Sequence, residues 1–191
     1  MDLSREALHS RMSEALGIYV SAMGYPRGTE QHRAPMWAEH SLRPGWRAVA
    51  ALGEPRADSA SSPPSAPPLL GIAYGYRGAR RQWWCEEVRA GLLGRSWSAG
   101  GVDSLLDGYF ELTELHVLPQ AQGLGLGEQL LRRLLADRTE PMVLLSTPEV
   151  PGENNRAWQL YRRLGFTDVL RDFTFAGDAR PFAVLGRPLP L

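Results

Sequence analysis

The chain has 191 residues, and its 21 basic residues balance 21 acidic ones, so its formal net charge at pH 7 is zero. A chain of this length can bury the core of one domain, and the neutral balance argues against nucleic acid and against a polybasic membrane contact. The single cysteine, Cys85, excludes an internal disulfide and a cysteine-based metal cluster.

The sequence also gives no reason to expect a membrane protein. No apolar run approaches the ~20 residues that a membrane-spanning helix needs. The first residues do not follow the cationic and then apolar layout of a signal peptide. We therefore expect a cytoplasmic protein with one domain over residues 1–191.

Apolar spacing predicts the elements of the first half of the chain. Leu8, Met12 and Leu16 recur at helical spacing, and Ser4 precedes them as a residue that can cap a helix. In chain order we expect a helix at 4–22, a weaker helix at 30–44, and strands at 46–52 and 69–76.

Two segments interrupt this pattern. Residues 53–68 are rich in Pro, Ser and Ala and cannot bury enough apolar surface to order themselves, so we expect a flexible loop there. Residues 77–108 hold a short helix near 82–93, followed by a loose Ser/Gly/Asp loop. The paired Trp83 and Trp84 either form an aromatic wall for a ligand or fix the segment to the core, and one pair can do both.

The second half is organised around a strand at 109–117. Its side chains alternate between the two faces of a sheet, so Glu114 and His116 lie on one face and Glu111 on the other. A glycine-rich turn follows the strand, and then a helix with a buried leucine stripe and three arginines that should face solvent. These residues are Leu130, Leu131, Leu134, Leu135 and Arg132, Arg133, Arg138.

The glycine-rich turn, Gln122-Gly-Leu-Gly-Leu-Gly127, suits an anion. Glycines allow a ligand close to the backbone, and the first amides of a helix have no intrahelical partner. A P-loop is excluded because Glu128 and Gln129 follow the last glycine and the chain has no lysine. A dinucleotide fingerprint is excluded because its third glycine is missing.

The remaining elements complete an α/β pattern. Pro141 to Thr147 is a short apolar run, typical of a buried parallel strand. Residues 154–164 predict a helix with Asn154, Ala157, Tyr161 and Leu164 on one stripe. Two closing strands are expected at 167–175 and 181–186.

The two motifs together identify a resemblance. Gln122-x-x-Gly125-x-Gly127 resembles the acetyl-CoA pyrophosphate loop of the GCN5-related N-acetyltransferase (GNAT) superfamily. Asn154-x-x-Ala157-x-x-Leu-Tyr161-x-x-Leu-Gly-Phe166 is similar to its second motif. The resemblance covers residues 109–187. It implies a GNAT fold: a twisted mixed sheet of six to seven strands flanked by helices, with a splayed parallel pair at acetyl-CoA. It also makes residues 77–108 an insertion near the acceptor site.

The resemblance further implies roles for individual residues. Tyr161 would protonate the leaving thiolate, and Glu114, then Glu111, then His116 are the candidates for accepting the amine proton. The splayed end of the strand would pair with the pantetheine arm, Ala157 would let it pass and Asn154 would hydrogen-bond it. The expected cofactor contacts are Leu115, His116, Val117, Gln122, Gly123, Leu124, Gly125, Leu126, Gly127, Asn154 and Ala157.

The implied reaction is direct transfer of an acetyl group from acetyl-CoA, as co-substrate, to an amine. We expect no metal, because His32 and His40 have no third ligand nearby. A small-molecule amine is the first expectation for the acceptor, and a protein N-terminus or lysine is the alternative. An acyl-CoA-binding sensor without turnover stays open, and so does a homodimer.

Overall fold

The computed structural model describes residues 1–54 and 66–191, so most of the loop expected at 53–68 lies outside the described residues. The helices are α1 (Arg5–Ser10), α2 (Met12–Met23), α3 (Thr29–Ser41), α4 (Trp83–Gly94), α5 (Ala99–Leu105), α6 (Leu126–Leu135) and α7 (Arg156–Arg163). The strands are β1 (Asp2–Leu3), β2 (Arg47–Leu52), β3 (Leu69–Arg77), β4 (Phe110–Val117), β5 (Met142–Pro148), β6 (Thr167–Phe173) and β7 (Phe182–Pro188). Two short 3-10 turns are η1 (Pro119–Ala121) and η2 (Pro151–Glu153).

The described strands form one mixed sheet of seven strands in the order β1-β2-β3-β4-β5-β7-β6. Four of the pairings are antiparallel, namely β1 with β2, β2 with β3, β5 with β7 and β6 with β7. β4 and β5 are parallel, with Phe110 opposite Val143 and Glu111 opposite Leu144. The expected α/β class with a parallel pair is thereby confirmed. The parting of these two strands near Val117 stays a prediction.

The chain divides into two compact units, and each is described by itself. Unit 1 comprises Met1–Gly75 and Glu114–Leu134. Unit 2 comprises Tyr76–Thr113 and Leu135–Leu191. Both β3 and β4 begin in one unit and continue into the other.

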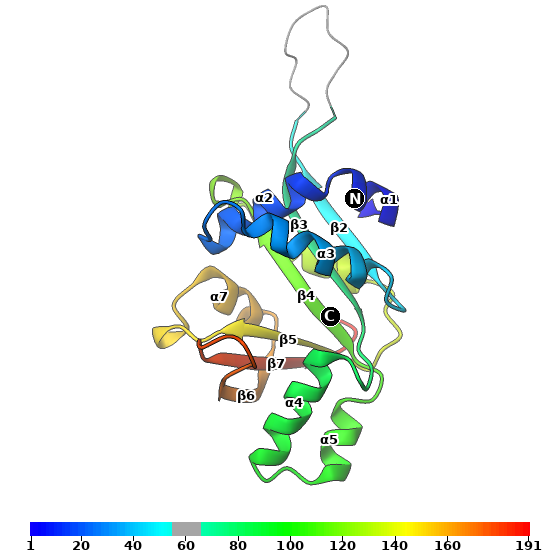
Figure 1. Ribbon diagram of the computed structural model, residues 1–191, viewed down its shortest axis with the longest axis vertical. Coiled ribbons are helices and arrows are strands. Elements are labelled where there is room, and N and C mark those ends of the chain that lie inside the picture. Colours follow the sequence, from blue (N-terminus) through cyan, green and yellow to red (C-terminus); the bar gives the residue numbers. More distant parts are fainter. Residues whose placement is uncertain (55–65) are drawn as a thin grey trace, which may run out of the picture. The chain divides into compact units, whose positions relative to one another are not determined.

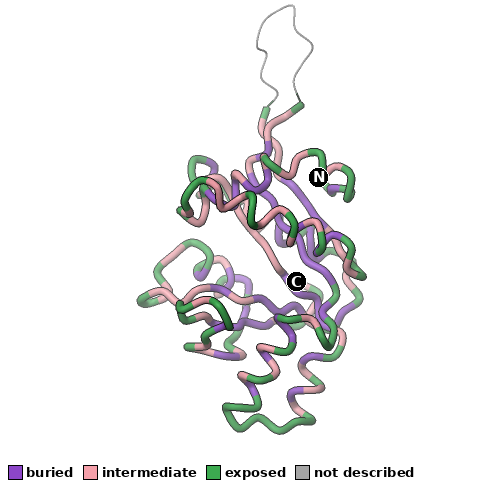
Figure 2. The backbone as a smooth tube through the Cα atoms, viewed as in Figure 1, coloured by how far each residue is buried: buried purple, intermediate pink, exposed green. Residues whose placement is uncertain are grey.

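Unit 1 is built from β1, β2, most of β3, the end of β4, the helices α1 to α3 and nearly all of α6. α2 and α3 lie across β2 and β3 (Figure 1), and buried residues run along these strands (Figure 2). Ser4 caps α1 as expected, and its hydroxyl accepts a hydrogen bond from the amide of Ala7. The single helix expected at 4–22 is instead two helices that meet at Arg11. The Arg11 guanidinium donates to the carbonyl of Pro67 at 2.7 Å, so the break ties these helices to the start of β3.

Unit 2 places α4 and α5 side by side (Figure 1) on a core shared with β5, β6 and β7. Trp84 is buried in this core, and its indole N–H donates to the hydroxyl of Ser146 at 3.1 Å. Trp83 is 55% exposed and contacts Phe175 with its ring. The paired tryptophans therefore divide their roles, since one fixes the segment to the core and the other faces solvent.

Two local expectations are wrong. The segment after α4 is not a loose loop, because Ser98 caps α5 and Val102 and Leu106 are buried against the unit 2 core. Arg138 does not face solvent. Its guanidinium lies over the Phe110 ring and pairs with Glu140, whose side chain is 1% exposed. The leucine stripe of α6 is buried as predicted.

Candidate active site

The glycine-rich turn lies directly between β4 and α6 in unit 1. Gly123 and Gly125 have φ values of 84° and 75°, the left-handed region that favours glycine. The amide side chain of Gln122 donates to the carbonyl of Val117 at 3.0 Å, which closes the turn against the end of β4. The Gly125 carbonyl accepts from the amide of Gln129, so it makes the first turn of α6. The preceding amides have no intrahelical acceptor and can bind an anion.

Leu124 and Leu126 separate these glycines. Leu124 is 68% exposed, so the turn presents an apolar side chain beside its free amides. Such a surface combines an anion site with apolar contact. It suits a ligand that carries a charged group on an organic arm.

The end of β4 adjoins β3 on one side. The amide of Leu118 donates to the carbonyl of Leu70, and a Cβ built on Gly71 would lie 3.0 Å from the carbonyl oxygen of His116. The backbone of β4 is therefore closely packed against β3 here. The expected pairing of Leu115, His116 and Val117 with a pantetheine arm stays a prediction.

Glu114 and His116 share a face of β4, as the alternation predicts, and their side chains meet. His116 Nε2 lies 2.5 Å from Glu114 Oε2. The other carboxylate oxygen, Oε1, accepts the indole N–H of Trp37 on α3 at 3.2 Å. Both side chains are 11% exposed, so the pair is shielded but not sealed from solvent. Here a carboxylate holds an imidazole in place.

Aromatic side chains from α2 and α3 surround this pair. The Tyr19 ring packs edge-on against the His116 ring, with centroids 5.1 Å apart, and it also contacts Tyr25 and Trp37. The guanidinium of Arg33 lies 5.5 Å from the centre of the Tyr19 ring. Burial raises the pKa of the Tyr19 hydroxyl, so this phenol stays protonated.

His40 lies one layer deeper in the same unit. Its Nδ1 is 3.0 Å from the hydroxyl of Tyr74, and burial lowers its pKa to about 4, with Arg43 acting in the same direction. It is therefore neutral at physiological pH. A neutral, enclosed imidazole supports the packing of α3 on β3 and is not placed to exchange protons with a ligand.

Glu111, the second carboxylate of β4, lies in unit 2. It is 3% exposed, and its Oε1 accepts the hydroxyl of Tyr76 at 2.8 Å. Tyr109 is fully buried, and burial raises the pKa of its hydroxyl, with Glu111 adding to the effect. Glu111 therefore takes part in a buried polar cluster, whereas Glu114 is partly open to solvent.

The second sequence motif spans α7 and the residues that flank it in unit 2. The helix expected at 154–164 begins at Arg156, where Asn155 caps it: the side-chain oxygen of Asn155 accepts the amide of Trp158 at 2.9 Å. Asn154 lies before the helix and is exposed, as is Ala157. Tyr161 is 7% exposed and packs against the ring of Phe166. Asn154 and Ala157, at the start of the predicted stripe, are therefore exposed, whereas the Tyr161 side chain further along it is buried.

A network of ion pairs fixes the segment that precedes α7. The Arg162 guanidinium pairs with Glu153 and Asp168, and that of Arg171 pairs with Glu149 and Glu153. Both guanidinium groups lie about 5 Å from the Trp158 ring centre, as expected for cation–π contacts. Glu153 has a left-handed φ of 55°, which the network holds in place just before Asn154.

The predicted residues therefore fall into two groups. Unit 1 brings Glu114 and His116 together on the strand that leads into the loop of Gln122 to Gly127. Unit 2 holds Glu111, Asn154, Ala157 and Tyr161. Sequence reasoning missed the Trp37 contact, because 77 residues separate it from Glu114. The only available signal was aromatic residues in this part of the chain, namely Tyr19 on α2, Tyr25 after it and Trp37 on α3.

A family model for the acetyltransferase (GNAT) domain matches residues 80–168. A Mycobacterium tuberculosis protein named as a GCN5-like protein acetyltransferase is 55% identical over 201 residues, which cover 100% of this chain and 98% of that protein. The chain belongs to the GNAT family. Membership of this family makes it an acetyltransferase, and the resemblance that its two motifs indicated is confirmed.

Solved GNAT structures share the fold at low identity. The ribosomal-protein-S18-alanine N-acetyltransferase from Escherichia coli has a TM-score of 0.55 at 14% identity, over 95% of this chain and 90% of that one. The spermidine/spermine N-acetyltransferase SpeG from Vibrio cholerae has a TM-score of 0.52 at 14% identity, over 98% of this chain and 91% of that one. These relatives act on different amines, so the GNAT fold alone does not define the acceptor.

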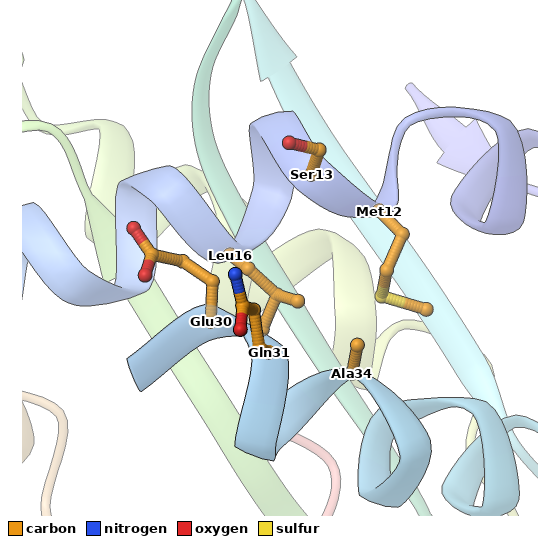
Figure 3. Close-up of a pocket in the computed structure, with 6 residues that line it drawn as sticks. All are labelled: Met12, Ser13, Leu16, Glu30, Gln31 and Ala34. Carbon is orange, nitrogen blue, oxygen red and sulfur yellow. The ribbon is translucent and has the colours of Figure 1, made fainter. Parts of the chain in front are cut away.

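A shallow hollow of about 280 Å³ lies between α2 and α3 (Figure 3). Met12, Ser13 and Leu16 of α2 and Glu30, Gln31 and Ala34 of α3 line it. It contains none of the predicted site residues.

The described residues hold no cluster of three or more histidine, cysteine or acidic side chains suited to a metal ion. None of their helices combines the length and the apolar character that crossing a bilayer requires.

Proposed function

We propose that this GNAT protein transfers an acetyl group from acetyl-CoA directly to an amine nitrogen. The observation that carries the proposal is the left-handed glycine turn at Gly123 and Gly125, which follows β4 and η1 and opens α6. Free amides at the start of a helix favour a pyrophosphate, and the exposed Leu124 suits the organic arm attached to it.

The reaction needs proton transfers, and we assign each one to a side chain. An amine is protonated at neutral pH and must lose a proton before it attacks a thioester carbonyl. The Glu114 and His116 pair is the partly open acid–base group in unit 1. We assign protonation of the leaving CoA thiolate to the Tyr161 hydroxyl, on the strength of the family motif that it completes.

Direct transfer fits better than a covalent acetyl-enzyme. Cys85 is 1% exposed, and burial raises the pKa of its thiol. Because the thiolate is the reactive form, a buried thiol of raised pKa is a poor nucleophile. The amine itself is therefore the group that attacks the thioester in our proposal.

For the acceptor we favour a protein amine. The Mycobacterium tuberculosis relative, which is 55% identical to this chain over its whole length, is named a protein acetyltransferase. The competing acceptor is the small-molecule amine expected from the sequence. The aromatic rings of Tyr19 and Trp37 around Glu114 support that alternative, because they would enclose a small ligand. Since either reaction draws on intracellular acetyl-CoA, we assign the protein to the cytoplasm.

Calorimetric titration with acetyl-CoA tests the cofactor site. We expect micromolar binding by the wild type and none by Gly125→Asp, which places a negative charge at a glycine with φ of 75°. Gly108→Asp is the matched control, since Gly108 has φ of 72° and a Cβ there would meet nothing within 4 Å. Equal binding by wild type and Gly125→Asp would overturn the site. No binding by the folded wild type would overturn the transferase proposal.

A two-arm acceptor screen then separates the acceptor classes. One arm offers a panel of small amines and the other offers lysine-containing proteins and peptides with free N-termini. CoA release is followed by a thiol reagent in both arms. Turnover confined to the protein arm supports our choice, and turnover confined to the small amines overturns it. Acetyl-CoA binding without turnover in either arm would indicate a sensor.

A further inference from the structure

Within the proposed transferase reaction, we infer that His116 is the group that takes the proton from the acceptor amine, while Glu114 and Trp37 position it. The inference rests on the proposed function. It differs from the usual assignment of this step to a strand carboxylate, because both carboxylate oxygens of Glu114 are already engaged by side chains of unit 1.

The contacts of Glu114 define its role. Oε1 accepts from Trp37 Nε1, which can only donate, and we take Glu114 to be the ionised carboxylate that this contact stabilises. Oε2 faces His116 Nε2 at 2.5 Å. An ionised carboxylate has no proton to give, so the imidazole nitrogen is the donor in this contact. Glu114 thus acts as a fixed acceptor at both ends, and Trp37 anchors it from α3.

This arrangement determines the tautomer of His116. A neutral imidazole carries one proton, and the Glu114 contact places that proton on Nε2. Nδ1 is then left with a lone pair and can accept a proton. The adjacent carboxylate stabilises the imidazolium that forms. A carboxylate that orients an imidazole and stabilises its charged form is an established arrangement for a general base.

His116 is also placed where the reaction needs a base. It lies at the end of β4, one residue before Val117, whose carbonyl holds the glycine turn through Gln122. Its side chain is 11% exposed, so a proton can leave for solvent after each turnover. His40, a buried histidine of unit 1, has its Nδ1 occupied by Tyr74 and its pKa lowered by burial.

The proposed step balances as follows. The ammonium form of the acceptor gives one proton to His116 Nδ1. The neutral amine attacks the thioester carbonyl, so a C–N bond forms and the C–S bond breaks. The attacking nitrogen then loses a second proton. This loss balances the proton that the thiolate takes up when it leaves as CoA thiol. The imidazolium then releases its proton to solvent.

Long-range proton–nitrogen NMR of the imidazole rings tests the geometry without any acceptor. The chain has four histidines, and the spectra of His116→Ala and His32→Ala assign two of them. We expect neutral His116 to carry its proton on Nε2 in the wild type and to lose this preference in Glu114→Gln. A proton on Nδ1 in the wild type would overturn the inference.

Kinetics with the best acceptor from the screen tests the catalytic role. His116→Ala should lower kcat/KM by about 10²–10⁴-fold and remove the acid limb of its pH profile. Added imidazole should raise the kcat/KM of this variant at least tenfold. The exposed His32→Ala is the matched control, and imidazole should leave it unchanged. Trp37→Phe, which removes the indole N–H donor and part of a buried ring, should show a smaller loss with the acid limb displaced.

The outcomes separate this inference from the proposed function. If His116→Ala transfers acetyl within threefold of the wild type and keeps its pH profile, the inference fails and the transferase proposal stands. If the wild type transfers no acetyl to any acceptor, both fail.

Several neighbouring groups also titrate or carry charge, and comparing the variants with the wild type at each pH separates their contributions from that of His116. They are Glu114 on β4, Tyr19 on α2, Tyr25 after it, Arg33 and His40 on α3, and Tyr74 on β3.

Discussion

At the scale of single residues, the Tyr161 hydroxyl carries the most specific chemical assignment. Tyr161→Phe should lower kcat by about 10²–10⁴-fold, because the thiolate would then leave without a proton donor. KM for acetyl-CoA should change little, since the ring and its contact with Phe166 remain. Steady-state kinetics at saturating acceptor gives both values.

A tyrosine outside the proposed site serves as the control. Tyr109 is fully buried in the same unit, so Tyr109→Phe removes a hydroxyl from a comparable environment. It should keep the wild-type kcat. A Tyr161→Phe enzyme as active as Tyr109→Phe would refute the role of general acid.

His40 makes stability depend on pH. Its pKa is lowered from 6.5 to about 4 in the folded protein, chiefly by burial. The unfolded chain therefore binds more protons between these values, and stability falls as the pH drops through this window. Through His40 alone, the free energy of unfolding should be about 2 kcal/mol lower at pH 5 than at pH 7.

Urea denaturation at pH 7 and pH 5 measures this loss. His40→Gln keeps a polar partner for Tyr74 but cannot take up a proton, so its unfolding free energy should change less between the two pH values. If wild type and variant lose equal stability, the pH dependence belongs to other groups.

At the scale of elements, local signals were readable from the sequence and tertiary ones were not. The glycine turn and the stripe of α6 follow from residue type and spacing, and both are present. α5 was missed because its start, Ala99-Gly-Gly, has weak helix propensity. Burial of Val102 and Leu106 overrides that propensity. The helix predicted at 154–164 begins later, at Arg156, because the side chain of Asn155 caps it and Asn154 lies outside the helix.

The candidate site shows the same division. The shared face of Glu114 and His116 follows from the period of a strand. Trp37, which completes the arrangement, comes from a helix distant in sequence, and no local pattern indicates such a contact. Arg138 was expected in solvent because its pairing with buried Glu140 and its place over Phe110 depend on tertiary packing.

The ion pairs around α7 should matter for the position of that element. Arg171 contacts Glu149, Glu153 and the Trp158 ring, and its hydrogen bonds lower the pKa of Glu149. Arg171→Gln should destabilise the protein by about 1 kcal/mol, because partial exposure screens these pairs. Because Asn154 follows this segment, KM for acetyl-CoA should rise more than kcat falls.

Thermal melts and acetyl-CoA saturation curves measure the two effects. Arg156→Gln is the matched control, since Arg156 is exposed at the first position of α7 and no ion pair of the described chain involves it. It should leave both quantities unchanged. A lowered melting temperature with an unchanged KM would show that the network supports the fold without positioning the α7 motif.

At the scale of the whole molecule, the absence of lysine is the most informative property of the composition. All 21 basic side chains are arginine. A guanidinium stays protonated at any pH at which the protein is folded, so it cannot attack a thioester. An acetyltransferase of this composition offers no side-chain amine to its own co-substrate.

The wild-type chain should therefore gain no side-chain acetyl group during prolonged incubation with acetyl-CoA. Intact-mass and peptide mass spectrometry after tag removal measures this. The exposed Arg27→Lys variant is the control, because it supplies the one lysine that chemical or enzymatic acetylation can modify. Acetyl groups found on wild-type side chains would contradict the expectation and reveal a nucleophile other than an amine. If none are found, every acetyl-lysine detected in the protein arm of the acceptor screen must lie on the added acceptor.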